Sequence, residues 1–133
     1  MATHTVLIAG RDRGTRASIR AACEPVPVRV VAEARGRWQA GELVRALAPE
    51  IALVDVGLLA CREFFLSGWG PVSRSTRIVA VGPDDPHLAH LLLAQGAAAY
   101  VPLARLHEEL PGCLGGHAPR RNGGYSSVTR TTA

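Results

Sequence analysis

The stretch VLIAGRDRGTR, residues 6–16, carries side chains that could do chemistry at the end of a strand. Four apolar residues run into a turn with two glycines and three arginines, and this pattern has two interpretations. One is a glycine-rich loop that binds a phosphate at the start of a helix. The other is a site from which the usual chemical groups have been lost. The residues that the fold places opposite this turn must decide between the two.

The elements that position this turn follow from the apolar pattern. The runs VLIA, IALV and IVAV are nearly continuous in apolar residues, as in strands buried on both faces of a parallel sheet. The pattern predicts strands at Thr5–Ala9, Val28–Ala34, Ile51–Val56, Arg77–Gly82 and Ala98–Leu103, and helices at Thr15–Cys23, Trp38–Leu47, Leu59–Trp69, Pro86–Gln95 and Leu106–Leu114. Alternation of this kind is typical of an α/β fold with helices on both faces of the sheet.

A doubly wound sheet of five parallel strands most often has the order 2-1-3-4-5, with its ligand crevice at the carboxyl ends of the first and third strands. Asp55 ends the third strand, so we expect its carboxylate to face the turn after Ala9 across that crevice. In one interpretation Asp55 only caps the following helix or pairs with Arg11. In the other it is the reactive or ligand-contacting centre of the fold.

Three further stretches carry a resemblance to a known family: LAPEIALVDV, STRIVAVG and LAQGAAAYVPL, the last of which contains the run QGAAAY. From Val6 to Leu114 the chain resembles the receiver domain of two-component response regulators, and especially receivers that precede a LuxR-type helix-turn-helix output. The resemblance implies a flavodoxin-like sheet and a phosphoryl group accepted on Asp55. Residues 1–114 are then one receiver-like domain, and residues 115–133 are a flexible tail or the start of a linker to a missing output domain.

The sequence departs from the family at the positions that do its chemistry. The family holds Mg²⁺ with two acids after the first strand, because Mg²⁺ prefers hard oxygen ligands. Here these positions are Gly10 and Arg11, and Asp12 comes one residue too late. We therefore expect no bound metal and no cofactor, and we hypothesise that Arg11 pairs with Asp55 in place of the metal.

The family's other two phosphoryl-contacting groups are also missing. Its Ser or Thr after the fourth strand is Gly82, and its Lys after the fifth strand is Leu103. The chain contains no lysine, so an error in alignment cannot restore the ammonium group, and only Arg105 follows nearby. We interpret Gly10, Arg11, Asp12, Asp55, Gly82 and Leu103 as a degenerate phosphoacceptor pocket. The small or apolar groups at Gly10, Gly82 and Leu103 could open an apolar pocket for a small-molecule ligand.

The function would then depend on surfaces that contact other molecules, and no longer on the pocket. The helix at Pro86–Gln95 is apolar in too many directions for one buried face, so we expect a homodimer interface at Leu88, Leu91 and Leu92. The resemblance implies that Tyr100 is the switch aromatic beside it. Pro111 and Gly112 make the length of the last helix doubtful.

Composition limits the remaining classes. Residues 1–114 have 12 arginines and 11 acids, so the basic excess lies in the tail, and contact with DNA is expected only through an output domain. No run of 18 apolar residues and no signal peptide is present, which favours a cytoplasmic protein without a membrane span. The three separated cysteines are interpreted as core residues.

The predicted function is a phosphorylation-independent receiver and not an enzyme. The alternatives are a conventional receiver phosphorylated at Asp55 and a nucleotide-binding α/β enzyme.

Overall fold

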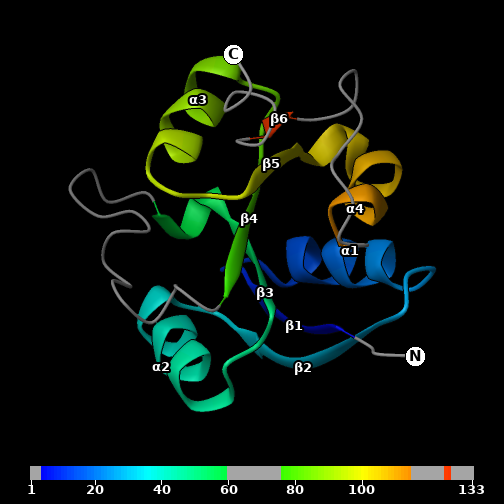
Figure 1. Cartoon of the computed structure of the whole chain (residues 1–133), viewed down its shortest axis with the longest axis vertical. Helices are drawn as coiled ribbons and strands as arrows, with labels where there is room; N and C mark the ends of the chain where they lie inside the picture. The colour runs from blue at the N-terminus through cyan, green and yellow to red at the C-terminus, as the bar shows by residue number, and fades with distance from the viewer. Residues whose placement is uncertain (1–3, 60–75, 115–124, 127–133) are drawn as a thin grey trace.

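The computed structural model describes residues 4–59, 76–114 and 125–126, with the side chains of the first two ranges (Figure 1). The elements in chain order are β1 (His4–Ala9), α1 (Arg13–Cys23), β2 (Val28–Ala34), α2 (Arg37–Leu47), β3 (Ile51–Asp55), η1 (Val56–Leu59), β4 (Arg77–Gly82), α3 (Pro86–Ala94), β5 (Ala99–Pro102), η3 (Leu103–Arg105), α4 (Leu106–Leu114) and β6 (Tyr125–Ser126). Nearly all predicted bounds agree to within two residues. The helix predicted at Leu59–Trp69 lies almost wholly outside the described residues.

The sheet has the order β2-β1-β3-β4-β5-β6. The first five strands are parallel, so the predicted order 2-1-3-4-5 is confirmed. The sixth strand was not predicted: Tyr125 and Ser126, from the stretch expected to be a tail, pair antiparallel with Tyr100 and Ala99 of β5. This short strand also lies against α3 (Figure 1). The other residues of that stretch lie outside the described part of the chain.

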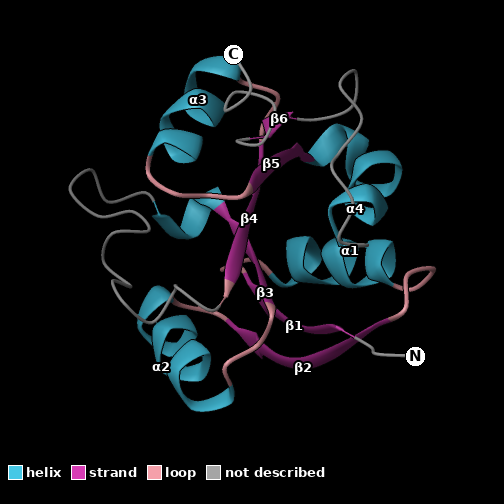
Figure 2. Ribbon diagram, viewed as in Figure 1, coloured by secondary structure: helices cyan, strands magenta, loops and turns pink. Residues whose placement is uncertain are grey.

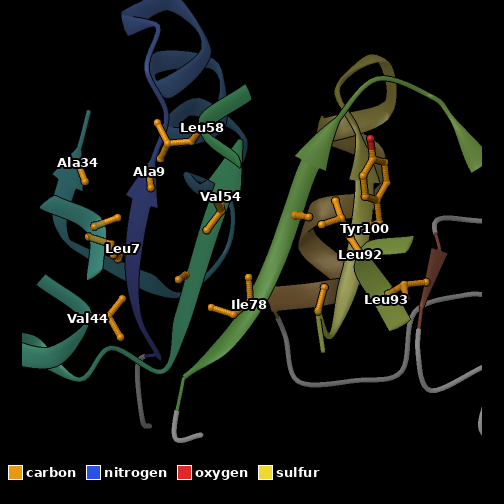
Figure 3. Packing of buried hydrophobic residues seen from close by; sticks show 14 of the residues in the cluster. Leu7, Ala9, Ala34, Val44, Val54, Leu58, Ile78, Leu92, Leu93 and Tyr100 are labelled. Atoms are coloured by element: carbon orange, nitrogen blue, oxygen red, sulfur yellow. The ribbon is translucent and has the colours of Figure 1, made fainter. Parts of the chain in front are cut away.

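Two apolar layers hold the helices to the sheet (Figure 2). The helices α2 and α3 pack on one face through Ala40, Val44, Ala89 and Leu92, together with Leu7, Val54 and Tyr100 from the strands (Figure 3). The helices α1 and α4 pack on the other face through Ile19, Leu110 and Leu114, together with Ile8, Leu53 and Val101. Burial on both faces explains why these strands are continuous in apolar residues rather than alternating.

Local signals set the helix ends. The Asp12 carboxylate caps α1, and the Asp85 carboxylate caps α3, where Pro86 fills the first helical position. The helix α2 ends in a left-handed residue, Ala48, just before Pro49. Leu47, in the last turn of α2, is exposed.

The last helix has the predicted bounds, because α4 runs from Leu106 to Leu114 even though it contains Pro111 and Gly112. A proline inside a helix removes one backbone hydrogen bond and costs about 3 kcal/mol. Burial of one leucine contributes roughly 1.5–3 kcal/mol. Because α4 buries Leu106, Leu110 and Leu114, the packing of its apolar face outweighs the lost bond.

Two cysteines are part of the core, as the sequence indicated. Cys23 and Cys113 are free and buried, and burial raises the pKa of each thiol to about 11. Both are therefore protonated near neutral pH and are poor nucleophiles. Cys61 lies outside the described residues. Among residues 4–59, 76–114 and 125–126, no helix has the length and apolar character needed to span a membrane.

The amino end of the sheet is tied together by Glu50. Its carboxylate accepts hydrogen bonds from Nδ1 of His4 at 3.0 Å and from the backbone N–H of Thr5 at 3.1 Å. In return, the N–H of Glu50 donates to the hydroxyl of Thr5 at 3.0 Å. These bonds connect the start of β1 to the residue before β3. The hydrogen bond from His4, followed by that from Thr5, lowers the pKa of Glu50.

Because the pKa of Glu50 is lower in the folded state, its contribution to stability is present above the unfolded pKa and is lost as pH falls through the folded pKa. Between pH 6 and pH 3, we expect the free energy of unfolding to decrease by less in the Glu50→Gln variant than in the wild type. Urea titrations at several pH values would measure this. Glu42→Gln, at an exposed carboxylate of α2, should follow the wild type; if Glu50→Gln does so too, the assignment is wrong.

Candidate functional site

Asp55 lies at the carboxyl end of β3, between the ends of β1 and β4, as the sequence predicted. It is half-buried, and its Oδ1 accepts a hydrogen bond from the N–H of Gly57 at 3.2 Å. A Cβ added to Gly10 would lie 3.4 Å from the Cβ of Asp55. The fold therefore brings together the Asp55 carboxylate and the first of the two positions at which acids were expected.

The hypothesis that Arg11 pairs with Asp55 is wrong. Among the described residues, no hydrogen bond or ion pair joins the two, and Arg11 is exposed. The guanidinium nearest to Gly10 belongs to Arg16, whose Cγ would lie 3.3 Å from a Cβ at Gly10. Its Nη1 donates to the carbonyls of Gly10 at 2.8 Å and Arg11 at 3.2 Å.

Sequence reasoning missed Arg16, although its position carries a signal. It lies in the first turn of α1, four residues after the Asp12 cap, on the side of the helix that faces the sheet edge. Its side chain is only 11% exposed, and its Nε donates to Oε1 of Glu33 at 3.3 Å. A largely buried cation is therefore fixed against the turn after β1 by bonds to backbone carbonyls and to a neighbouring strand.

Asp12 does not replace the missing acids. Its Oδ2 accepts hydrogen bonds from the N–H of Thr15 at 3.0 Å and from the hydroxyl of Thr15 at 3.2 Å. This carboxylate therefore caps α1 instead of pointing at Asp55. Gly14 lies inside α1, so the stretch GRDRGTR forms a capped helix start and not the glycine-rich turn of a dinucleotide loop.

These residues do not fit Mg²⁺. The ion requires several hard oxygen ligands in octahedral geometry, but among the described residues a single carboxylate, that of Asp55, lies at Gly10, which has no side chain. In the described part of the chain, no group of three or more His, Cys, Asp or Glu residues could hold a metal. The described residues at this edge of the sheet therefore do not supply a ligand set for the ion.

Gly82 lies at the end of β4, and its missing side chain has a direct structural reason. A Cβ at this position would lie 2.5 Å from Cγ2 of Val56 and 2.6 Å from the hydroxyl oxygen of Tyr100. Tyr100 is fully buried, and its hydroxyl donates to the carbonyl of Pro83 at 2.7 Å. The apolar pocket expected beside Gly82 is therefore absent at this position, because Val56 and Tyr100 fill the space.

Leu103 and Arg105 follow β5 on η3. Leu103 is 38% exposed. Arg105 donates from Nε to Oε2 of Glu109 at 2.7 Å and from Nη1 to Oδ2 of Asp84 at 3.0 Å. These hydrogen bonds, with Glu109 first, raise the pKa of Arg105 above its ordinary value. Arg105 thus connects the loops after β4 and β5 and pairs with these two carboxylates.

The surface proposed on the helix after β4 is smaller than the sequence indicated. Leu92 and Tyr100 are fully buried in the core, so neither can form an interface (Figure 3). Leu88 is partly buried, and Leu91, at 40% exposure, is the residue of the proposed set that reaches the surface. His87 and His90 of α3 are exposed.

The packing of Tyr100 on Gly82 predicts a steric cost for any side chain at residue 82. Gly82→Ala should lower the free energy of unfolding by about 1–3 kcal/mol, the usual cost of overpacking. The loss should be smaller in a Tyr100→Phe background, because the phenol oxygen that meets the new methyl group is gone. Urea denaturation of the two single variants and the double variant would measure this coupling.

Gly112→Ala is the matched control, because a Cβ at Gly112 in α4 meets nothing within 4 Å. It should stabilise the protein or leave it unchanged. Equal losses for Gly82→Ala with and without the Tyr100 hydroxyl would contradict the steric assignment.

No family model matches the sequence, and no curated protein matches it. Solved structures do match. The receiver domain of the response regulator NarL from Mycobacterium tuberculosis has a TM-score of 0.69 at 22% identity, covering 88% of this chain and 100% of that chain. The isolated receiver domain of RcsB from Salmonella enterica has a TM-score of 0.69 at 17% identity, covering 97% and 98%. A LuxR-family response regulator from Aurantimonas has a TM-score of 0.66 at 23% identity, covering 87% and 88%. This chain therefore has the fold of the receiver domain of two-component response regulators.

Proposed function

We propose that this chain is a receiver domain that works without phosphorylation and acts through contact with another protein in signal transduction. The observation that carries the proposal is the position of Arg16. Its guanidinium is bonded to the carbonyls of Gly10 and Arg11, the two residues at which metal-binding acids would stand. A cation fixed here opposes the binding of Mg²⁺ beside Asp55, because like charges in a half-buried site repel strongly.

The surroundings of Gly82 support the same conclusion. A receiver of the kind that the sequence resembles needs a hydroxyl side chain after β4, and at Gly82 there is no room for one while Tyr100 points inward. The Tyr100 hydroxyl is bonded to Pro83 in this conformation. The aromatic ring therefore holds one position that does not depend on a phosphoryl group.

The output of such a domain would be regulatory. RcsB from Salmonella typhimurium, of which this chain covers 67% in one longer structure, was studied for DNA interaction. By analogy, we propose a role in transcriptional regulation, in the cytoplasm, with DNA reached only through an output domain. The proposal includes no catalytic activity for the domain itself.

A direct test is available, because the RcsB receiver domain was solved with the phosphomimetic BeF₃⁻. We expect NMR spectra of this chain to show no shift changes around Asp55 on addition of Mg²⁺ and BeF₃⁻. Incubation with acetyl phosphate and Mg²⁺ should give no added phosphoryl mass in intact-protein mass spectrometry.

The Gly10→Asp/Arg11→Asp/Arg16→Ala variant is the positive control, because it restores two carboxylates beside Asp55 and removes the cation that opposes the metal. A Cβ at Gly10 meets its neighbours at 3.3 Å or more, so the aspartate can be accommodated with small shifts. Addition of Mg²⁺ should change the NMR chemical shifts of this variant and not those of the unmodified chain. A phosphoryl group found on Asp55 of the unmodified chain would refute the proposed function and favour a conventional receiver.

A further inference from the structure

The carboxyl edge of the sheet separates positive from negative charge along its length. In the sheet order β2-β1-β3-β4-β5, arginines follow the first two strands and aspartates follow the next two. The arginine half of the edge consists of Arg35 and Arg37 after β2, and Arg11 and Arg13 after β1; the aspartate half consists of Asp55 after β3, and Asp84 and Asp85 after β4.

The arginine half forms one surface because β1 and β2 end side by side. The N–H of Gly10 donates to the carbonyl of Ala34 at 3.0 Å, so both loops start from neighbouring points. Arg11, Arg13 and Arg35 are exposed, and within the described ranges none of them has an ion-pair partner.

The nearest acids do not cancel this charge. Glu33 already bonds Arg16 and Arg20 of α1. Asp12 also lies in this half and keeps its charge while it caps α1, so it offsets only one of the arginines. The arginine half therefore keeps a net positive charge.

The aspartate half keeps a net negative charge. Asp84 and Asp85 are exposed, and Asp85 retains its charge while it caps α3. The cation in this half is Arg105, which is shared between Asp84 and Glu109. One guanidinium therefore faces several carboxylates.

Each end of the edge also carries an exposed apolar side chain. Trp38, at the start of α2 in the arginine half, is 80% exposed, the highest value of any large apolar residue described. Leu103 extends from η3 at the other end. Tryptophan is enriched at the centre of protein interfaces, where its large surface is removed from water. The position of Trp38 thus indicates a partner on this edge.

We propose that this edge is the interface of a homodimer with two-fold symmetry, in which the arginine half of one protomer faces the aspartate half of the other. A two-fold interface uses the same patch twice, so that patch must be complementary to itself. An edge with opposite charges in its two halves meets this condition, and the same rotation brings Trp38 towards Leu103 of the second copy. Nucleic acid fits less well, because its phosphates would match one half and be repelled by the other.

This inference rests on the proposed function, because it treats the edge around Asp55 as a contact surface and not as a phosphorylation site. Sedimentation equilibrium of the whole chain should show a dimer at about 50 mM salt that weakens at about 0.5 M, where exposed charges are screened. Arg11→Glu/Arg13→Glu should weaken dimerisation at least about tenfold. Asp84→Asn/Asp85→Asn should do the same, while the amide oxygen of the asparagine introduced at position 85 keeps the α3 cap.

The matched control is Arg45→Glu/Arg77→Glu, which changes the net charge equally at exposed positions away from this edge. It should dimerise like the wild type. Mixing Arg11→Glu/Arg13→Glu with Asp84→Arg should restore a mixed dimer, because the reversed charges again face opposite ones. In a Trp69→Phe background, where Trp38 is the remaining tryptophan, fluorescence should shift to shorter wavelength as the dimer forms.

Three results would overturn the dimer. They are a monomer at all concentrations and salt conditions, equal losses in the control variant, and a monomer whose arginine half binds duplex or single-stranded DNA. The first two leave the proposed function standing, since that depends on the absence of phosphorylation at Asp55, whereas the third would also contradict the proposal that DNA is reached only through an output domain. A phosphorylated Asp55 would refute the function while the sedimentation results still decide the interface.

Discussion

The contact between Tyr100 and the bare backbone of Gly82 constrains the rest of the site. The phenol oxygen lies where a side chain at residue 82 would begin, and Val56 closes the same space from the end of β3. Because protein interiors are close-packed, these three residues cannot change independently. With Gly82, the aromatic ring can stay buried and bond Pro83. Tyr100 can therefore point inward in this structure, because Gly82 has no side chain in the space that the tyrosine hydroxyl occupies.

Around Asp55 the governing interaction is electrostatic. A cluster of acids must be neutralised by a metal or repel itself, whereas a single carboxylate needs no ion. The bonds from Arg16 to the carbonyls of Gly10 and Arg11 fix its charge against the turn after β1. The same bonds link α1 to that turn, and the Nε bond to Glu33 links it to β2. The residue that opposes metal binding therefore also stabilises the start of the first crossover.

The sequence predicted the sheet order and most element bounds because these depend on strong local signals: continuous apolar strands, caps at Asp12 and Asp85, and Pro49 after a helix. It predicted that Asp55 and Gly10 meet, because parallel topology places their strand ends together. It did not predict which of two similar side chains makes a given contact. Arg11 and Arg16 are both arginines near one acid, and only the direction of α1 decides which lies inward. The filling of space by Tyr100 at Gly82 likewise depends on tertiary packing, which apolar periodicity cannot reveal.

The loss of the metal site and the separation of charge on the edge are connected. Where acids after β1 must hold a cation, the whole carboxyl edge between β1 and β4 is negative, and two such edges repel each other. Replacement of those acids by Gly10 and Arg11 removes the repulsion and adds positive charge beside Arg35. The aspartates after β4 are left unchanged, because Asp85 caps α3 and Asp84 bonds Arg105. Local substitutions at one strand end therefore convert an edge that would repel its own copy into one whose halves attract. Under the proposed function, this edge would thus serve as a surface for protein contact without any change in the fold.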